Sequence, residues 1–207
     1  MGETVHIFLT IEQLYLLIFV VLYFGLVLGV RTLILYLRTG ISPSQKFGRK
    51  SEHHLAERLI PLAVILLLII AGNYFFLIQN IKYLLPFRVL DLLWLKHLGL
   101  ILSVVGLIAT FIAQLQMKDS WRIGLDHNNE IELVDKGMFA YSRNPIYVAL
   151  MTGYAGVFFI VPSLVSLGFV TIMAVAIYIK VKDEEQFLES KIGSPYQEYK
   201  AIVRRWI

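Results

Sequence analysis

Residues 144–179, NPIYVALMTGYAGVFFIVPSLVSLGFVTIMAVAIYI, form a continuous run without an acidic or basic side chain. At about 1.5 Å per residue this run reaches roughly 54 Å as a helix, too short for two full crossings of a ~30 Å hydrocarbon core plus a turn. Pro162 and Ser163 lie near its middle and mark a turn. The run therefore predicts a helical hairpin of two short or tilted helices, residues 146–161 and 163–181.

The composition of the whole chain places most of it in lipid. Hydrophobic residues make up 57% of the 207 residues and charged residues 16%, whereas soluble domains have roughly 25% charged residues. The net charge of +4 comes from basic residues in loops beside apolar runs, where anionic lipid headgroups rather than nucleic acid are the expected partner. The absence of cysteine excludes disulfides, thiolate nucleophiles and cysteine-ligated zinc.

Three further apolar segments, residues 13–30, 59–81 and 97–117, are long enough to cross a bilayer as helices. No lysine or arginine precedes the first segment and no small-residue cleavage site follows it, so we expect a retained span rather than a cleaved signal peptide. Together with the hairpin, these segments predict an all-α, multi-span membrane bundle with about five transmembrane helical segments.

The distribution of charge predicts how the bundle lies in the cell membrane, or in an internal membrane. The residues before the first span include acids but no lysine or arginine, whereas the loops 39–58 and 116–145 and the C-terminal tail are basic. Because basic loops stay on the cytoplasmic side, we expect the N-terminus outside and both polar clusters in the cytoplasm. The connection 82–96, with three basic residues, fits this pattern least well.

A polar stretch, residues 116–147, interrupts the apolar segments and carries groups suited to a charged small molecule. Asn144 suits the N-cap and Pro145 the first turn of the helix that follows, so a helix start explains both. It does not explain why Arg143 lies beside two tyrosines at the same boundary, where a helix N-terminus and an arginine together suit a carboxylate. A membrane anchor is the simpler interpretation of Trp121. The polar groups of the stretch are Trp121, Arg122, Asp126, Tyr141, Arg143, Asn144 and Tyr147.

A second polar cluster, KVKDEEQFLESKIGSPYQEY, follows the hairpin at residues 180–199. Three consecutive acids at 183–185 would be unfavourable at a helix C-terminus because of the helix dipole. Either the helix continues through about Lys191 and ends at Gly193, or the acids bind a cationic group, and both can hold. A solvated helix face explains any single acid about equally well. We expect this cluster to meet the polar stretch at the membrane surface and form one site.

The remaining side chains offer no metal site and no hydrolase site. His53 and His54 are adjacent, so they would diverge on a helix, and the other three histidines belong to separate segments. We therefore expect no metal ion, although imidazole is a common ligand. The sequence has no nucleophile elbow and no glycine-rich phosphate-binding loop after a strand.

Three sequence blocks resemble the isoprenylcysteine carboxyl methyltransferase and phospholipid methyltransferase group of membrane enzymes. The blocks are WRIG at 121–124, LVDKGMFAYSRNPIY at 133–147, and EEQFL followed by GSPYQEYKAIVRR within 184–205. The resemblance covers roughly residues 97–205 and implies a catalytic region at 97–207 after N-terminal spans at 1–96. It also implies S-adenosylmethionine, the donor of this group, bound by the C-terminal half of the chain.

The family motif assigns roles to individual residues. It usually reads Arg-His-Pro-x-Tyr followed by two glutamates, whereas here asparagine replaces the histidine at Asn144. Asparagine donates hydrogen bonds but is no base near neutral pH, so we expect Asn144 to position the donor. The catalytic residues implied are Arg143, Asn144 and Glu185. The cofactor contacts implied are Tyr141, Arg143, Asn144, Tyr147, Glu184 and Glu185.

The acceptor is expected to be a lipophilic small molecule, a lipid or a lipidated protein. A carboxylate acceptor needs alignment and desolvation but no base, and it is therefore favoured over an amine or hydroxyl. Trp121, Arg122 and Arg204 are the expected acceptor contacts, with Arg205 as the other arginine suited to an acidic group. Membrane anchoring explains these arginines equally well.

Two other functions remain open from the sequence. One is a membrane reductase of the sterol reductase type, which resembles this C-terminal arrangement but uses NADPH. The other is a small membrane scaffold or transporter subunit without enzymatic activity, which offers no reason for two paired polar clusters. The oligomeric state is not predicted.

Overall fold

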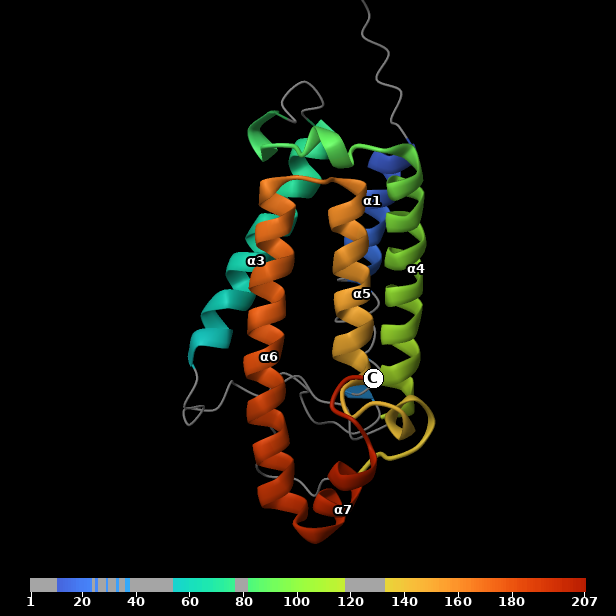
Figure 1. The fold of residues 1–207 in the computed structure, drawn as a ribbon, viewed down its shortest axis with the longest axis vertical. Helices are drawn as coiled ribbons and strands as arrows, with labels where there is room; N and C mark the ends of the chain where they lie inside the picture. Colours follow the sequence, from blue (N-terminus) through green and yellow to red (C-terminus); the bar gives the residue numbers. More distant parts are fainter. Residues whose placement is uncertain are drawn as a thin grey trace, which may run out of the picture.

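The computed structural model describes residues 11–23, positions 25, 29, 33, 36 and 37, and residues 54–76, 82–117 and 133–207. Over these residues the chain is helical and forms an elongated bundle without a β-strand (Figure 1). This confirms the all-α bundle predicted from the sequence. The elements are α1 (Ile11–Leu22), α3 (His54–Phe76), η3 (Arg88–Leu90), α4 (Leu93–Gln116), η5 (Gly137–Ala140), α5 (Pro145–Ile160), α6 (Leu164–Ile192) and α7 (Ser194–Ile202).

Three of the described helices are long and apolar enough to cross a membrane. They are α3, over Leu55–Asn73, together with α4 and α6, while α5 is apolar but shorter. The spans predicted at 59–81 and 97–117 correspond to α3 and α4, which begin at His54 and Leu93. The first predicted span, 13–30, overlaps α1, and several of its later residues lie outside the described part.

The predicted hairpin is present, but its two arms differ in length. α5 has 16 residues, or about 24 Å of helix, which confirms the expected short arm. The apolar part of the second arm was predicted to end at residue 181, with a possible continuation through about Lys191 to Gly193. The continuation is confirmed, because α6 has 29 residues and ends before Gly193. It continues because Leu188 and Ile192 on its last turns pack against an apolar cluster that includes Tyr196 on α7.

Turn chemistry fixes both ends of α6. At its start Ser163 and Ser166 form a capping box, in which each side chain bonds to the backbone N–H of the other at 3.1 Å. At its end Gly193 has φ 73°, a backbone conformation that glycine adopts without strain. Pro195 then lies in the first turn of α7, after which the chain returns to the residues before α5.

α4 and α5 approach each other closely through small residues. A Cβ added to Gly106 would lie 2.5 Å from the backbone nitrogen of Gly153 and 2.7 Å from Ala149 O. One added to Gly99 would lie 2.7 Å from Gly156 O. Small residues at such positions let two membrane helices pack backbone to backbone. This close packing holds α4 and α5 in a fixed position relative to each other.

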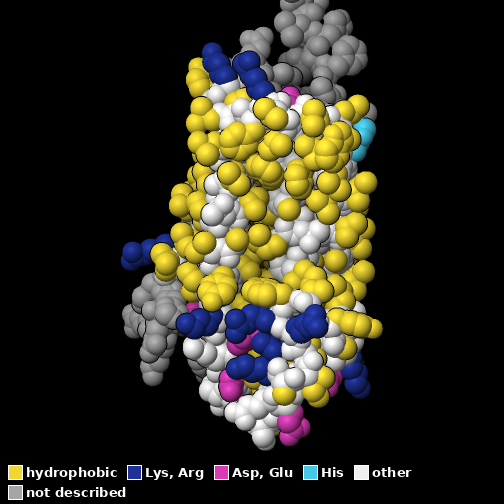
Figure 2. Space-filling model, in the orientation of Figure 1, with side chains coloured by type: hydrophobic (Ala, Val, Ile, Leu, Met, Phe, Trp, Pro, Cys, Tyr) yellow, Lys and Arg dark blue, Asp and Glu magenta, His cyan; other side chains and the backbone are white. Residues whose placement is uncertain are grey.

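The two ends of the bundle differ in composition. An apolar belt covers the visible face, and basic and acidic side chains gather below it around the end of α6, α7 and the tail (Figures 1 and 2). At the opposite end the segment 82–92 bonds to the α5–α6 turn, through Phe87 N to Pro162 O at 2.8 Å and Leu164 N to Leu85 O at 3.0 Å. The described residues of the two predicted polar clusters, 133–147 and 180–199, lie with the tail 200–207 at one end, here called the polar cap (Figure 1).

Candidate functional site

Three chain segments meet in the polar cap because of how the flanking helices begin and end. Residues 141–144 immediately precede α5, whose first residue is Pro145. The last turns of α6 extend beyond its apolar part and carry Glu184 and Glu185. α7 then returns the chain, so that residues 203–207 lie against the start of α5.

Glu185 lies at the centre of this convergence and binds two arginines. Its side chain is only 6% exposed. Oε1 accepts from Arg143 Nε at 3.1 Å and Nη2 at 3.0 Å. Arg205 donates from Nη2 to Oε2 at 2.7 Å, and from Nε to Oε2 at 3.0 Å and Oε1 at 3.2 Å. Such charge-assisted, forked pairs fix orientation as well as contributing energy.

The electrostatics of the cluster follow from this pairing. Burial alone would raise the pKa of the Glu185 carboxyl, but hydrogen bonds from Arg205 and Arg143 outweigh burial and lower its pKa below the usual value. The same bond raises the pKa of the Arg205 guanidinium. Nearby, burial raises the pKa of Tyr199 to about 12, and its hydroxyl donates to Phe139 O at 2.7 Å. Glu185 is therefore ionised and the cluster is charged at neutral pH.

Asn144 occupies the N-cap position, but its side chain does not cap α5, contrary to the expectation from the sequence. Its Nδ2 donates instead to Arg205 O at 3.2 Å and to Glu185 Oε1 at 3.4 Å. The amide turns toward the cluster because Glu185 and the tail backbone provide acceptors there. The Asn144 side chain thus makes no capping bond to the first turn of α5, and the N-terminus of a helix favours an anion.

Tyr147 and Glu184 form a separate pair on the side of α5 that faces α6. The Tyr147 hydroxyl donates to Glu184 Oε2 at 2.9 Å. The two acids at 184 and 185 thus have different partners, since Glu185 binds arginines and Glu184 binds a tyrosine. This difference was not visible in the sequence, where the two acids are adjacent.

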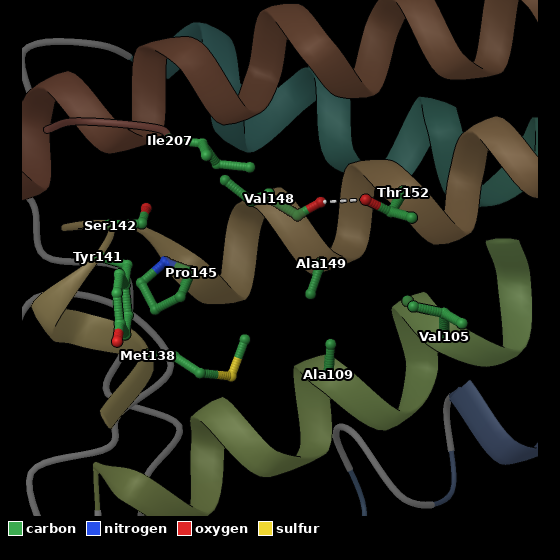
Figure 3. A pocket seen from close by; sticks show the side chains of 11 residues that line it. Val105, Ala109, Met138, Tyr141, Ser142, Pro145, Val148, Ala149, Thr152 and Ile207 are labelled. Carbon is green, nitrogen blue, oxygen red and sulfur yellow. Dashed lines mark hydrogen bonds between the residues drawn. The ribbon is translucent and has the colours of Figure 1, made fainter. Parts of the chain in front are cut away.

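An apolar pocket of about 290 Å³ lies beside the cluster, between α4 and α5. Tyr141 stands at its polar end and is 81% exposed, and Ile207 covers one side (Figure 3). Sequence reasoning did not find this pocket, because its wall combines residues from three separated segments, 105–109, 138–152 and Ile207. The lining residues are Val105, Gly106, Ala109, Met138, Tyr141, Ser142, Pro145, Val148, Ala149, Thr152 and Ile207.

The residues expected to contact the acceptor do not join the cluster through their side chains in the described part of the chain. Trp121 and Arg122 lie outside the described residues. Arg204 has an exposed side chain, and only its backbone oxygen joins the cluster, accepting from Arg143 N at 2.9 Å. Arg205 is the arginine whose side chain reaches Glu185. Within the part of the chain that is described, no three His, Cys, Asp or Glu residues gather as metal ligands would.

The comparison with protein families agrees with this arrangement of a helical membrane bundle and a polar cap. Residues 94–194 match the phospholipid methyltransferase family model. The match confirms the resemblance drawn from the sequence, and it supports a membrane methyltransferase in general terms. The match includes α4, α5, α6 and the residues from Arg143 to Glu185, but not residues 195–207. A comparison with curated proteins gives no match.

Proposed function

We propose that the protein transfers a methyl group from S-adenosylmethionine to a lipophilic acceptor at the polar cap, with a carboxylate as the favoured acceptor. The observation that carries this proposal is the position of the Arg143–Glu185–Arg205 cluster. Arg143 lies in the chain between Ser142 and Pro145, which both line the apolar pocket, and Glu185 follows the apolar part of α6. A polar donor and an apolar acceptor can meet at such a boundary.

The polar groups at the start of α5 and on the last turns of α6 suit S-adenosylmethionine, the cofactor that this family generally uses. When bound, it supplies a methyl group activated by the positive charge on sulfur. The uncapped first turn of α5 suits its carboxylate, and the carboxylate of Glu184, already held by Tyr147, suits ribose hydroxyls or the amino group. Tyr141, exposed beside the pocket, offers an aromatic face.

Arg143, Asn144 and Glu185 are the proposed catalytic group. Glu185 holds both arginines in fixed directions, and Asn144 aligns the start of α5 with the tail through its amide. None of the three removes a proton in this proposal. A carboxylate acceptor is already nucleophilic, so these residues contribute by alignment and by exclusion of water.

Binding of cofactor fragments separates this proposal from the reductase alternative. We expect purified protein in nanodiscs to bind S-adenosylhomocysteine and to show no saturable binding of NADPH by calorimetry. Arg143→Ala should weaken S-adenosylhomocysteine binding, whereas Glu189→Gln, at an exposed ion pair with Lys200, should not. Tight NADPH binding without S-adenosylhomocysteine binding would overturn the methyltransferase reading.

A further inference from the structure

We propose that residues 82–96, here called the distal segment, bind the headgroups of anionic phospholipids at the end of the bundle opposite the polar cap. Lys82 and Arg88 are the residues that contact the lipid phosphate. This binding site is independent of the proposed function, because it lies at the other end of the bundle. The same segment fits the predicted orientation least well, since it carries three basic residues.

The distal segment has a fixed conformation on the α5–α6 turn. Phe87 N donates to Pro162 O, and Leu85 O accepts from Leu164 N. Leu85 has φ 54°, a backbone conformation that residues other than glycine rarely adopt. Such a conformation persists only where the surrounding contacts enforce it, and it often marks a functional site. The side chains of this segment are therefore presented in set positions.

The distal segment exposes large apolar side chains. Val89 is 85% exposed and Trp94 is 63% exposed, and no residue of η3 is buried. Tryptophan and tyrosine are enriched where a membrane meets water, because one part of each side chain is apolar and another part polar. The segment therefore suits the headgroup layer better than bulk water. Its exposed large apolar residues are Tyr83, Leu85, Val89, Leu92, Leu93 and Trp94.

The same segment keeps two positive charges available to an anion. Its one acid, Asp91, pairs with Lys96, whose Nζ lies 2.8 Å from Asp91 Oδ1. Lys82 and Arg88 are exposed, and neither pairs with an acid among the residues that the structure describes. Lys82 Nζ instead lies 5.2 Å from the centre of the Tyr83 ring.

An anionic phospholipid matches both features of the distal segment at once. Each free basic residue has an exposed apolar neighbour in the chain, Tyr83 after Lys82 and Val89 after Arg88. A phospholipid likewise presents a phosphate next to its acyl chains. Lysine or arginine side chains project from this end just beyond the apolar belt (Figure 2), at the level where headgroups lie. A soluble anion would leave the apolar side chains uncovered.

The charges at the two ends of the bundle support a lipid partner in either orientation. The polar cap also exposes basic residues, among them Lys136, Lys200 and Arg204. Whichever end faces the cytoplasm, the other end therefore carries basic residues where the positive-inside rule disfavours them. Contact with anionic headgroups of that leaflet gives Lys82 and Arg88 a partner and accounts for this departure from the rule.

Lipid-borne quenchers test the proposal in the full chain, which has no cysteine. Val89→Cys places a single thiol next to Arg88 for a bimane fluorophore. The labelled protein is placed in phosphatidylcholine vesicles with a constant fraction of phosphatidylglycerol. A nitroxide near the headgroup end of one acyl chain is carried either by phosphatidylcholine or by phosphatidylglycerol, at a constant total amount. The ratio of the two quenching curves gives the preference of the distal segment for the anionic lipid.

Lys82 and Arg88 should each contribute about fivefold to the preference for phosphatidylglycerol, which corresponds to about 1 kcal/mol for each charge near an anionic surface. Arg88→Gln and Lys82→Gln should each lower the preference by that factor, and the double variant should abolish it. Arg88→Lys should keep it, because the charge is retained. Arg58→Gln is the matched control, since Arg58 is an exposed arginine at the start of α3, away from the distal segment (Figure 1). It should leave the preference unchanged.

Four results would overturn the proposal. Quenching by neither lipid would place the distal segment outside the headgroup layer, and equal quenching by both would show that it does not select an anion. Equal preference in Arg88→Gln and Arg58→Gln would remove Arg88 from the site. An equal loss in Arg88→Lys and Arg88→Gln would show that Arg88 has a structural role instead of binding lipid by its charge. Thermal unfolding of each variant verifies that it is folded.

Discussion

Arg205 and Glu185 form a forked ion pair, with Arg205 Nη2 2.7 Å from Glu185 Oε2, that joins the tail to α6. The carboxylate is almost fully buried, while the Arg205 side chain is partly exposed. Arg143 completes the cluster from the start of α5. One acid therefore links three segments that are separate in the sequence.

Glu185→Gln should lower the free energy of unfolding markedly, because it leaves two arginines facing a neutral amide. Breaking a buried ion pair from one side costs roughly 3–5 kcal/mol, and the partial exposure of Arg205 places the expected loss toward the lower value. Chemical unfolding of purified protein measures it. The control is Glu189→Gln, at an exposed pair, where a loss of about 1 kcal/mol or less is expected. Equal losses would show that Glu185 is not the centre of the cap.

The contribution of Glu185 should depend on pH in one direction. Its pKa is lowered in the folded protein from the ordinary value of 4.5, so its stabilisation is fully present above that value and disappears as the pH falls through the folded pKa. The difference in unfolding free energy between the parent and Glu185→Gln should stay constant from about pH 7 to 5 and shrink below about pH 4. A difference that shrinks on raising the pH would contradict the assigned pairing.

Arg143→Lys should weaken S-adenosylhomocysteine binding almost as much as Arg143→Ala. The guanidinium of Arg143 binds Glu185 through Nε and Nη2, and Val203 O and Lys200 O through Nη1. A lysine ammonium cannot reproduce this fork. We expect both variants to lose about tenfold or more in S-adenosylhomocysteine affinity, comparable with the loss of one charged hydrogen bond. Calorimetry measures the affinity, and near-parent binding by Arg143→Lys would exclude a geometric role.

Gly106→Ala should destabilise the bundle and disturb the pocket. The added methyl would lie 2.5 Å from Gly153 N, a backbone atom that cannot move without separating α4 and α5. We expect a loss of about 1–3 kcal/mol, as for other overpacked sites. Gly168→Ala is the control, since nothing lies within 4 Å of its added Cβ, and there alanine should stabilise the helix by roughly 0.5–1 kcal/mol. Thermal unfolding of the two variants should therefore shift in opposite directions.

The sequence was sufficient to predict the long apolar helices but not α7 or the partners within the site. The charge-free run 144–179 predicted the hairpin because a bilayer requires long apolar helices, and the acids at 183–185 indicated that α6 could run on to Gly193. Hydropathy carries no information on which donor binds which acid. It could not distinguish Glu184, bound to Tyr147, from Glu185.

The apolar pocket could not be predicted for a similar reason. Its wall brings Ile207 beside Ala109 and Val148, residues that are far apart in the chain and individually ordinary for a membrane protein. At Asn144 the local sequence made a clear prediction, and the structure differs from it. Its position predicts an N-cap, but its side chain makes no capping bond, and its Nδ2 donates to Arg205 O and Glu185 Oε1. The N-outside orientation and the boundary at residues 96–97 stay predictions.

Transfer of a labelled methyl group tests the central claim most directly. Purified protein in proteoliposomes made with a total membrane lipid extract is incubated with S-adenosylmethionine labelled in its methyl group, and the organic-soluble label is counted. The account predicts label in the organic phase, released as methanol by mild base if the acceptor is a carboxylate, and lost in Arg143→Ala but retained in Glu189→Gln. The account would be contradicted if the parent protein gave no label in the organic phase, or if the parent and Arg143→Ala gave equal label.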